Sequence, residues 1–294
     1  MPRFGAHLSI AGGLPRAVDR AVATRCESLQ IFTKSVGQWR ARPLPPDEVA
    51  RFRARVEETG IQPVVAHNSY LINLAAAEPA LRAQSLSALG EEIDRAEALG
   101  LDGLVMHPGS FTTGTEEGGL RLVADGLRTL LRQRRRGRVR ILLEQTAGQG
   151  TNLGHRFEHL AAIIERLDGT PRVAVCLDTC HLLAAGYDLC SEEGYRDTFA
   201  NLDRVVGLDR LAAFHMNDSK KPCGSRVDRH EHIGKGCIGL EPFRRLVNDP
   251  RFARMPMLLE TPKLDTPESR RLSDADPWDR RNLRTLRGLV NRPG

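Results

Sequence analysis

Short apolar runs that read as β-strands alternate with helical patterns along the whole chain. Such a run occurs eight times, and between the runs apolar residues repeat at three- and four-residue spacings, as in residues 79–99 and 119–131. Alternation of this kind favours a parallel sheet covered by helices. The expected strands are Phe4–Leu8, Ser28–Phe32, Gln62–Ala66, Gly103–Met106, Val139–Leu143, Arg172–Leu177, Ala212–Met216 and Met257–Leu259.

The alternation runs through all 294 residues without a linker-like segment or an internal repeat. Eight β/α units of this length fit a single (β/α)₈ barrel, the TIM barrel, so we expect one domain over residues 1–294. A doubly wound sheet is the alternative, because counting strands in one sequence is prone to error.

Composition excludes disordered, fibrous and membrane-spanning classes. Apolar residues make up 40% of the chain, and no apolar stretch approaches the ~20 residues that span a bilayer. The N-terminus lacks a basic segment followed by an apolar one, so we expect a cytoplasmic protein without a membrane partner. The six cysteines form no CxxC pair, and we expect them to be reduced, with Cys176 and Cys180 as small buried side chains.

The formal net charge of +6 permits a nucleic-acid partner but does not require one. Only five of the 43 basic residues are lysines, an arginine bias that the coding genome alone can produce. The densest basic run, residues 132–140, follows a helical pattern and precedes a strand. We therefore expect the solvated end of a helix there.

An ionisable side chain stands at the same end of each of six successive strand candidates. In a barrel these ends form one rim, where such enzymes carry their chemistry. Three histidines and three carboxylates share a pocket only at large pKa costs unless a cation binds them, and a mixed set favours zinc, manganese or iron. The six residues are His67, His107, Glu144, Asp178, His215 and Glu260.

Three more candidate ligands lie in loops on the same side, namely His181, Asp228 and His230. With about four ligands per ion, nine ligands predict two or three metals. We expect His7 behind the ligands, and His232 as a possible competitor of His230.

His155 and His159 have the i, i+4 spacing of a helical zinc site. They stand at a helix start in a polar stretch, and we expect surface residues there.

Longer motifs surround these positions, and they resemble the endonuclease IV family of apurinic/apyrimidinic endonucleases. The resemblance follows nearly the whole chain in order. It is carried by Gly5–Ser9 with Gly12–Gly13, Phe32–Lys34 with Gln38–Trp39, His67–Leu74, His107–Ser110, Glu144–Gly150, Leu177–His181, His215–Gly239 and Leu259–Pro262.

The resemblance implies a barrel with three Zn²⁺ ions, some of whose sites Mn²⁺ or Fe²⁺ could occupy. It also implies a partner, duplex DNA with abasic sites or 3′-blocking lesions, cut on the 5′ side of the abasic site to leave a 3′-hydroxyl and a 5′-deoxyribose phosphate. A water between two zinc ions would be acidified enough to attack phosphorus. Nine ligands within one chain need no second subunit, so we expect a monomer.

By motif position, the resemblance divides the nine ligands into three sets that share Glu144. Glu144 and Glu260 are the expected catalytic residues. The sets are His67, His107 and Glu144; Glu144, Asp178, His215 and Glu260; and His181, Asp228 and His230.

For DNA binding, the resemblance points to the loops of the same rim. Tyr70 and Leu71 resemble the family's wedge that enters the duplex, although packing on the next helix is the alternative. The expected backbone contacts are Lys34, Asn217, Ser219, Lys220, Arg226 and Arg229.

Two positions depart from the family pattern. Gly37 stands where some members carry an arginine that inserts into the DNA gap, and Gln145 replaces a shorter residue after the bridging glutamate.

Two rival functions also stay open, a divalent-metal sugar isomerase or epimerase and a non-catalytic DNA-binding barrel. The first leaves the third ligand set unexplained, and the second requires lost ligands.

Overall fold

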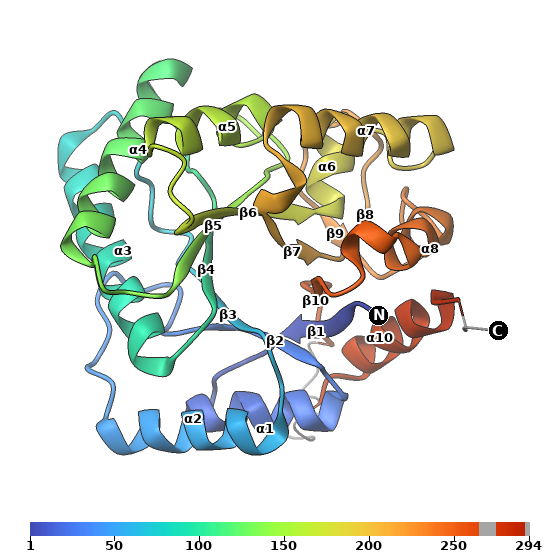
Figure 1. Cartoon of the computed structure of the whole chain (residues 1–294), viewed down its shortest axis with the longest axis horizontal. Helices are drawn as coiled ribbons and strands as arrows, with labels where there is room; N and C mark the ends of the chain where they lie inside the picture. The colour runs from blue at the N-terminus through green and yellow to red at the C-terminus, as the bar shows by residue number, and fades with distance from the viewer. Residues whose placement is uncertain (265–274, 292–294) are drawn as a thin grey trace.

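Eight parallel strands close into a barrel in the computed structural model, which describes residues 1–264 and 275–291 (Figure 1). The rest of the expected domain 1–294 lies outside the described residues. Ala6 in the first strand pairs with Leu29 on one side and Leu259 on the other, which closes the sheet. The strands, in order around the barrel, are β1 (Arg3–His7), β2 (Ser28–Phe32), β3 (Val64–His67), β4 (Gly103–Met106), β5 (Arg140–Glu144), β6 (Val173–Asp178), β7 (Leu211–His215) and β10 (Pro256–Leu259).

The predicted barrel is therefore confirmed, and the doubly wound alternative is wrong. All eight expected strands exist, and their bounds differ from the expected ones by at most two residues. The largest shift is in β3, which begins after Pro63 because proline has no N–H to donate to a sheet.

Helices surround the barrel, and local signals set their ends. In the 21-residue helix α3, the Glu78 side chain accepts hydrogen bonds from the first N–H groups, and Gly100 ends the helix in the left-handed conformation. Thr115 caps α4 in the same way, so that helix begins before the expected residue 119. The helices are α1 (Leu14–Thr24), α2 (Pro46–Thr59), α3 (Pro79–Leu99), α4 (Glu116–Gln133), α5 (Phe157–Arg166), α6 (Thr179–Ala185), α7 (Glu192–Val205), α8 (Leu240–Asn248) and α10 (Pro277–Leu289), with short 3₁₀ turns η1 (Leu208–Arg210) and η2 (Pro250–Phe252).

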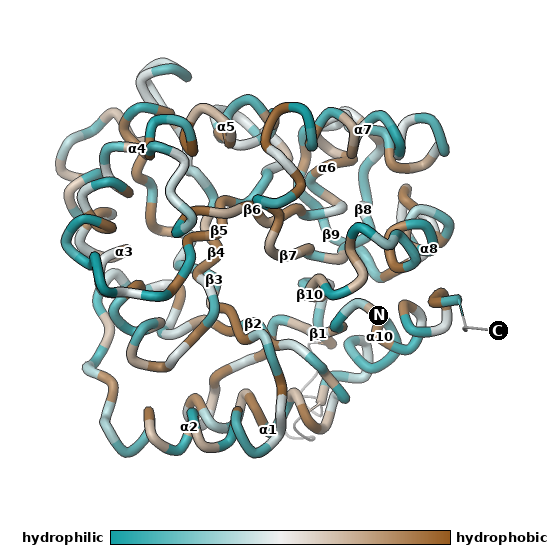
Figure 2. Tube along the Cα trace, viewed as in Figure 1, coloured by the Kyte–Doolittle hydropathy of each residue, from teal (hydrophilic) through white to brown (hydrophobic). Residues whose placement is uncertain are grey.

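Apolar side chains fill two layers. The larger core lies between the barrel and the helices, and a smaller cluster fills the barrel interior. The tube in Figure 2 is accordingly brown along much of the barrel and teal on the outer helix faces. A two-stranded antiparallel ribbon, β8 (Asp218–Ser219) with β9 (His230–Glu231), projects from the segment after β7 and was not expected.

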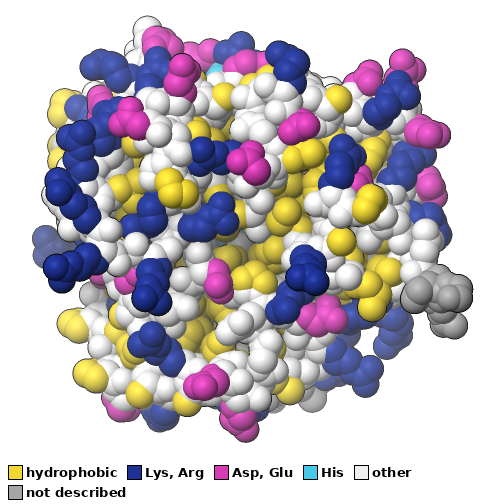
Figure 3. Space-filling view, in the orientation of Figure 1, with side chains coloured by type: hydrophobic (Ala, Val, Ile, Leu, Met, Phe, Trp, Pro, Cys, Tyr) yellow, Lys and Arg dark blue, Asp and Glu magenta, His cyan; other side chains and the backbone are white. Residues whose placement is uncertain are grey.

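Charge is dispersed over the surface rather than gathered. On the face in Figure 3, dark-blue Lys and Arg side chains alternate with magenta Asp and Glu. Residues 134–137 form the turn that ends α4, as expected for the densest basic run. Among the described helices, none combines the length and apolarity needed to cross a membrane.

Candidate metal centre

On six strands, an expected ligand stands two residues after a side chain that fills the barrel interior. The interior cluster contains Val65, Val105, Leu142, Cys176, Ala213 and Leu258. Because successive strand residues face opposite sides, the residue two positions further along also faces inward, at the carboxyl end of each strand. Those residues are His67, His107, Glu144, Asp178, His215 and Glu260.

The buried carboxylate of Glu144 lies at the centre of this layer, with a histidine group on each oxygen. Its Oε2 lies 3.0 Å from Nε2 of His67 and 3.1 Å from Nε2 of His107. Its Oε1 lies 2.9 Å from Nδ1 of His215 and 3.4 Å from Nδ1 of His181. Glu144 is thus placed to bridge two ligand sets.

The second set extends from His215 toward two more carboxylates. Nδ1 of His215 lies 3.2 Å from Oε2 of Glu260 and 3.9 Å from Oδ2 of Asp178. In each expected set that contains Glu144, one potential ligand atom per residue falls within 4.8 Å of all the others. The structure therefore brings both sets together.

Asp228 joins the third set, between two histidines. Its Oδ2 lies 3.2 Å from Nε2 of His181, and its Oδ1 lies 3.2 Å from Nε2 of His230. Oδ2 of Asp178 lies 3.6 Å from the same His230 nitrogen, so this set adjoins the second. The strand β9 carries His230, and the N–H of Asp228 donates to Gln149 in the loop after β5.

Three of the histidines donate one ring N–H to a backbone carbonyl. A carbonyl can only accept, so in the neutral ring the proton lies on that nitrogen, and the other nitrogen, which faces the carboxylates, can bind a metal as in metal-ligating histidines. Nε2 of His230 is buried and has no hydrogen-bond partner among the described residues. The pairs are His67 Nδ1 with Asn68 O at 2.8 Å, His181 Nδ1 with Gln145 O at 2.9 Å and His230 Nδ1 with Glu260 O at 3.2 Å.

The electrostatic field of the site favours positive charge. Burial alone would raise the pKa of Glu144, but His215 and His107 hold it well below its usual value. Burial would lower the pKa of His181, yet Asp178 and Asp228 raise it well above its usual value. The carboxylates thus favour a bound cation, either protons on the rings or a metal.

Comparison with known proteins places the chain in a family. Residues 18–287 match the family described as "Xylose isomerase-like TIM barrel". A relative from Chloroflexus aurantiacus named "Probable endonuclease 4" is 52% identical, and the match covers 99% of each chain. A solved structure, endonuclease IV from Thermus thermophilus, is 41% identical with a TM-score of 0.83 and covers 98% of each chain.

The chain belongs to the endonuclease IV family. It is accordingly an enzyme of a nuclease family, as its motifs predicted. Other solved barrels have a similar shape, among them a D-psicose 3-epimerase with a TM-score of 0.68. At 13% identity that likeness shows the fold alone.

Four residues expected at the DNA interface are exposed near the centre. The Tyr70 side chain is 63% exposed, and its ring centroid lies 5.4 Å from that of His67. Lys220 and Arg229 are exposed on the segment that carries Asp228 and His230. Arg226 is also exposed, and it donates a hydrogen bond to Nε2 of His155.

Three other residues with the same expected role are buried, which removes them from the surface that a DNA backbone can reach. Nζ of Lys34 donates to the Trp39 carbonyl and lies 3.3 Å from Oε1 of Glu92. Asn217 donates to Asp178 at 2.6 Å and accepts from the N–H of Glu260 at 2.9 Å, so it orients two candidate ligands. Ser219 bonds to the backbone of Lys221 and shapes the loop.

The wedge candidate and the two departures from the family pattern also have clear places. Leu71 is half-buried, beside the exposed Tyr70. Gly37 is exposed, and a Cβ there would meet nothing within 4 Å, so a larger side chain fits. Gln145 is buried and donates to the Thr146 carbonyl at 2.7 Å.

The expectation that His155 and His159 are surface residues is wrong for His159, which is 1% exposed. Its Nδ1 accepts the N–H of Gly154, so the proton of the neutral ring lies on Nε2, which is 3.3 Å from Oε2 of Glu116. The first bond ties the loop after β5 to the start of α5. A helix start in a polar stretch did not reveal this burial, because the loop folds back over the ring.

The other two histidines, His7 and His232, differ in whether they lie at the candidate metal centre. His7 is close to the centre, with Nδ1 3.4 Å from Oε1 of Glu260. His232 stacks on Trp278 at a centroid distance of 3.9 Å and does not join His230. Sequence reasoning also missed Gln30, whose only signal is a polar residue within the apolar strand β2. Its Nε2 donates to Glu260 at 2.5 Å.

Proposed function

We propose that this chain is a zinc-dependent apurinic/apyrimidinic endonuclease of base excision DNA repair. It hydrolyses the phosphodiester on the 5′ side of an abasic site and leaves a 3′-hydroxyl and a 5′-deoxyribose phosphate. The observation that carries the proposal is Glu144, whose two oxygens each face a separate histidine group in one buried layer.

The donor set fits zinc, with His67, His107, Glu144, Asp178, His181, His215, Asp228, His230 and Glu260 as the residues that would hold three ions. Ligands about 2.0–2.1 Å from a tetrahedral zinc lie roughly 3.3 Å from one another. The nitrogen–oxygen distances of 2.9–3.4 Å around Glu144 and of 3.2 Å on both oxygens of Asp228 agree with that spacing. Mn²⁺ or Fe²⁺ in some of the sites fits the same mixed donors.

Zinc ions bound there would activate water near neutral pH and polarise the phosphate oxygens. Three such ions would bring six positive charges against four carboxylates, so the loaded centre attracts a phosphodiester. The protein's own part is to hold the ligands: the carbonyls behind His67, His181 and His230 fix each ring. Asn217 and Gln30 do the same for the carboxylates of Asp178 and Glu260.

Recognition of the lesion is proposed for the rim around this centre. Tyr70 projects from the loop after β3, beside His67 and His107, where its ring can enter the stack at a damaged nucleotide. An abasic nucleotide has no base to unstack, so extruding it costs less than extruding an intact one. Lys220, Arg226 and Arg229 are exposed near the same opening for phosphate contacts. All nine ligands come from one chain, which supports a monomer.

The test uses an end-labelled duplex with one tetrahydrofuran abasic analogue, which resists β-elimination. We expect a cut on its 5′ side that prolonged chelation abolishes and added zinc restores. A chain that carries metal by elemental analysis but leaves this duplex intact would contradict the proposal. Turnover of a ketose would then favour the sugar-epimerase alternative. A second duplex ending in a 3′-phosphoglycolate tests the proposed action on 3′-blocking lesions.

A further inference from the structure

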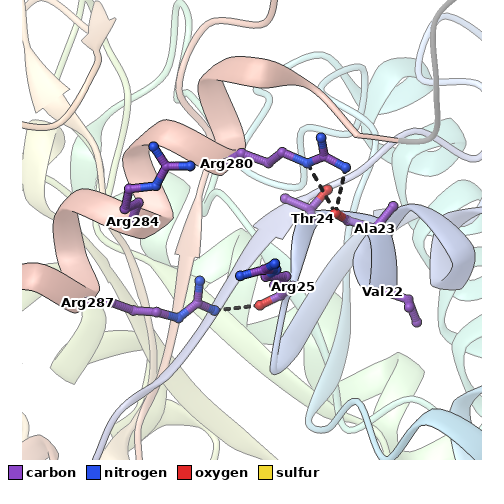
Figure 4. Close-up of a pocket in the computed structure, with 7 residues that line it drawn as sticks. All are labelled: Val22, Ala23, Thr24, Arg25, Arg280, Arg284 and Arg287. Carbon is purple, nitrogen blue, oxygen red and sulfur yellow. Dashed lines mark hydrogen bonds between the residues drawn. The ribbon is translucent and has the colours of Figure 1, made fainter.

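A second polar cavity lies on the outside of the barrel, between the end of α1 and the helix α10 (Figure 4). Its volume is about 460 Å³, within the usual range for small-ligand sites. Residues 22–24 and four arginines line it. We call it the arginine cavity and define it by Arg25, Arg280, Arg284 and Arg287.

The four guanidinium groups have no acidic partner among residues 1–264 and 275–291. Every ion pair found in this part of the chain joins other residues, although many of the arginines elsewhere are paired. A second arginine-rich hollow, at residues 132–137, differs in this respect. Glu97 lies in its wall, and Arg134 pairs with Asp94 at 2.7 Å. Of these two hollows, only the arginine cavity has no carboxylate paired with its arginines in the described part of the chain.

Part of this charge has a structural use. Arg280 donates two hydrogen bonds to the carbonyl of Ala23, and Arg287 donates one to the carbonyl of Arg25. Such bonds cap the carboxyl end of α1, where carbonyls lack helical partners and cations are favoured. A guanidinium carries five N–H donors, so the four groups still have most of their donors unused. Arg25 and Arg284 take no part in the cap.

A buried side chain in the wall also lacks a partner among residues 1–264 and 275–291. Thr24 is 1% exposed and lines the cavity, and no described residue hydrogen-bonds its hydroxyl oxygen. Figure 4 shows it beside Arg280, at one side of the group of arginines. Buried hydroxyl groups normally have a hydrogen-bond partner. Here both the arginine guanidiniums and the Thr24 hydroxyl have donors without an acceptor in the described residues.

The position of the cavity separates it from the candidate metal centre. Helices of a β/α barrel run opposite to the strands, so α1 ends at the amino end of the barrel, three residues before β2 begins. The candidate ligands lie at the carboxyl end. A straight duplex seated on that end therefore does not cover the arginine cavity.

We propose that the arginine cavity binds a compact oligophosphate, an anion with two or more linked phosphate groups. Guanidinium groups pair with phosphate oxygens through two parallel hydrogen bonds, which gives both charge and direction. Four neighbouring guanidiniums around a space of about 460 Å³ match several phosphate charges in one small ligand.

The test is calorimetric titration of inorganic pyrophosphate into the full-length protein with its metals bound. Pyrophosphate can also bind at the candidate metal centre. The test is therefore the difference in pyrophosphate affinity between the cavity variant and its control. The Arg25→Gln/Arg284→Gln variant removes two exposed guanidiniums that support no structural bond. The matched control is Arg196→Gln/Arg204→Gln on the exposed side of α7, with the same change in charge.

We expect the cavity variant to bind pyrophosphate at least about tenfold more weakly, because it loses two charge-assisted contacts, and the control to bind as the wild type does. Thermal unfolding midpoints equal to that of the wild type establish that both variants fold. Equal pyrophosphate affinity in all three proteins would overturn the proposal. A loss of affinity for undamaged duplex alone, with pyrophosphate binding unchanged, would also overturn it in favour of a DNA-binding surface.

Discussion

The Nε2–H of His215 donates a hydrogen bond of 2.8 Å to Oε1 of Gln30. This bond leaves Nδ1 of the same ring free to face Glu144 and Glu260. The amide group of Gln30 also donates to Glu260, so one neutral side chain orients a histidine and a carboxylate at once.

Replacing Gln30 with leucine removes both bonds and keeps the side-chain size. We expect zinc retention and cleavage of the tetrahydrofuran duplex to fall by about 10–100-fold, the usual cost of losing such a supporting contact. Elemental analysis and initial rates measure the two effects. Gln84→Leu, at an exposed position on α3, is the control. Full metal content and full rate in Gln30→Leu would show that His215 needs no such support.

The proposed mechanism depends most on the negative charges of Glu144 and Glu260. Glu144→Gln or Glu260→Gln keeps the shape but removes a negative charge that faces His215. We expect cleavage to fall by more than about a hundredfold, while binding of abasic duplex stays measurable because the rim residues are unchanged. Initial cleavage rates measure the first effect, and gel-shift affinities for abasic duplex measure the second. Cleavage comparable with that of the wild type would count against these roles.

Tyr70 tests the proposed wedge. Tyr70→Ala removes an exposed ring, and we expect the preference for abasic over undamaged duplex to fall by about tenfold, in line with one lost base–aromatic stack. Tyr70→Phe keeps the ring and should keep the preference. Competition binding with the two duplexes measures it. An unchanged preference in Tyr70→Ala would leave the residue only its packing contacts with Phe32, His67 and His107.

His159 makes stability depend on pH. Burial, with help from His155 and Arg156, lowers its pKa to about 4, whereas an unfolded histidine titrates near 6.5. Between pH 4 and pH 6.5 the unfolded chain binds more protons than the folded chain, so the free energy of unfolding rises as pH rises through this range. Lowering the pH from 6.5 to 5 therefore decreases the free energy of unfolding by about 2 kcal/mol through this group.

His159→Gln removes this titration and offers an oxygen to the N–H of Gly154. Urea unfolding of both proteins at pH 5, 6 and 7 measures the effect, and metal contributions common to both cancel in the difference. We expect the wild type to lose more stability than the variant on acidification. Parallel pH profiles would mean that His159 keeps an ordinary pKa in the folded protein.

The sequence was most informative where the chain alternates with a strict period. Val65 and His67, or Leu258 and Glu260, share a face because they are two residues apart in a strand. Once the strands were placed, the ends of six of them therefore identified six neighbouring side chains. Asp228 and His230 were predicted only from their place in a loop on the same side, because no strand period relates them to the rest, and the resemblance then assigned them to the third set.

Burial in loops could not be predicted in this way. Lys34 and Asn217 stand next to rim motifs, but their side chains turn inward to Glu92 and Asp178. The partners lie 58 and 39 residues away in the chain, so only the folded arrangement reveals them. Gln30 was missed for the same reason, since its two partners come from β7 and from the residue after β10.

The ligand layer draws on β3 through β10, and its last member, Glu260, arrives only when β10 has paired with β1 and β7. Until then, Glu144 and the histidines before it form a partial set that lacks one wall. A chain that is still being synthesised, or one cut before β10, therefore carries no complete centre. If the proposed ligand layer is the nuclease centre, a chain without β10 lacks Glu260, and we expect unfinished copies to cut no DNA.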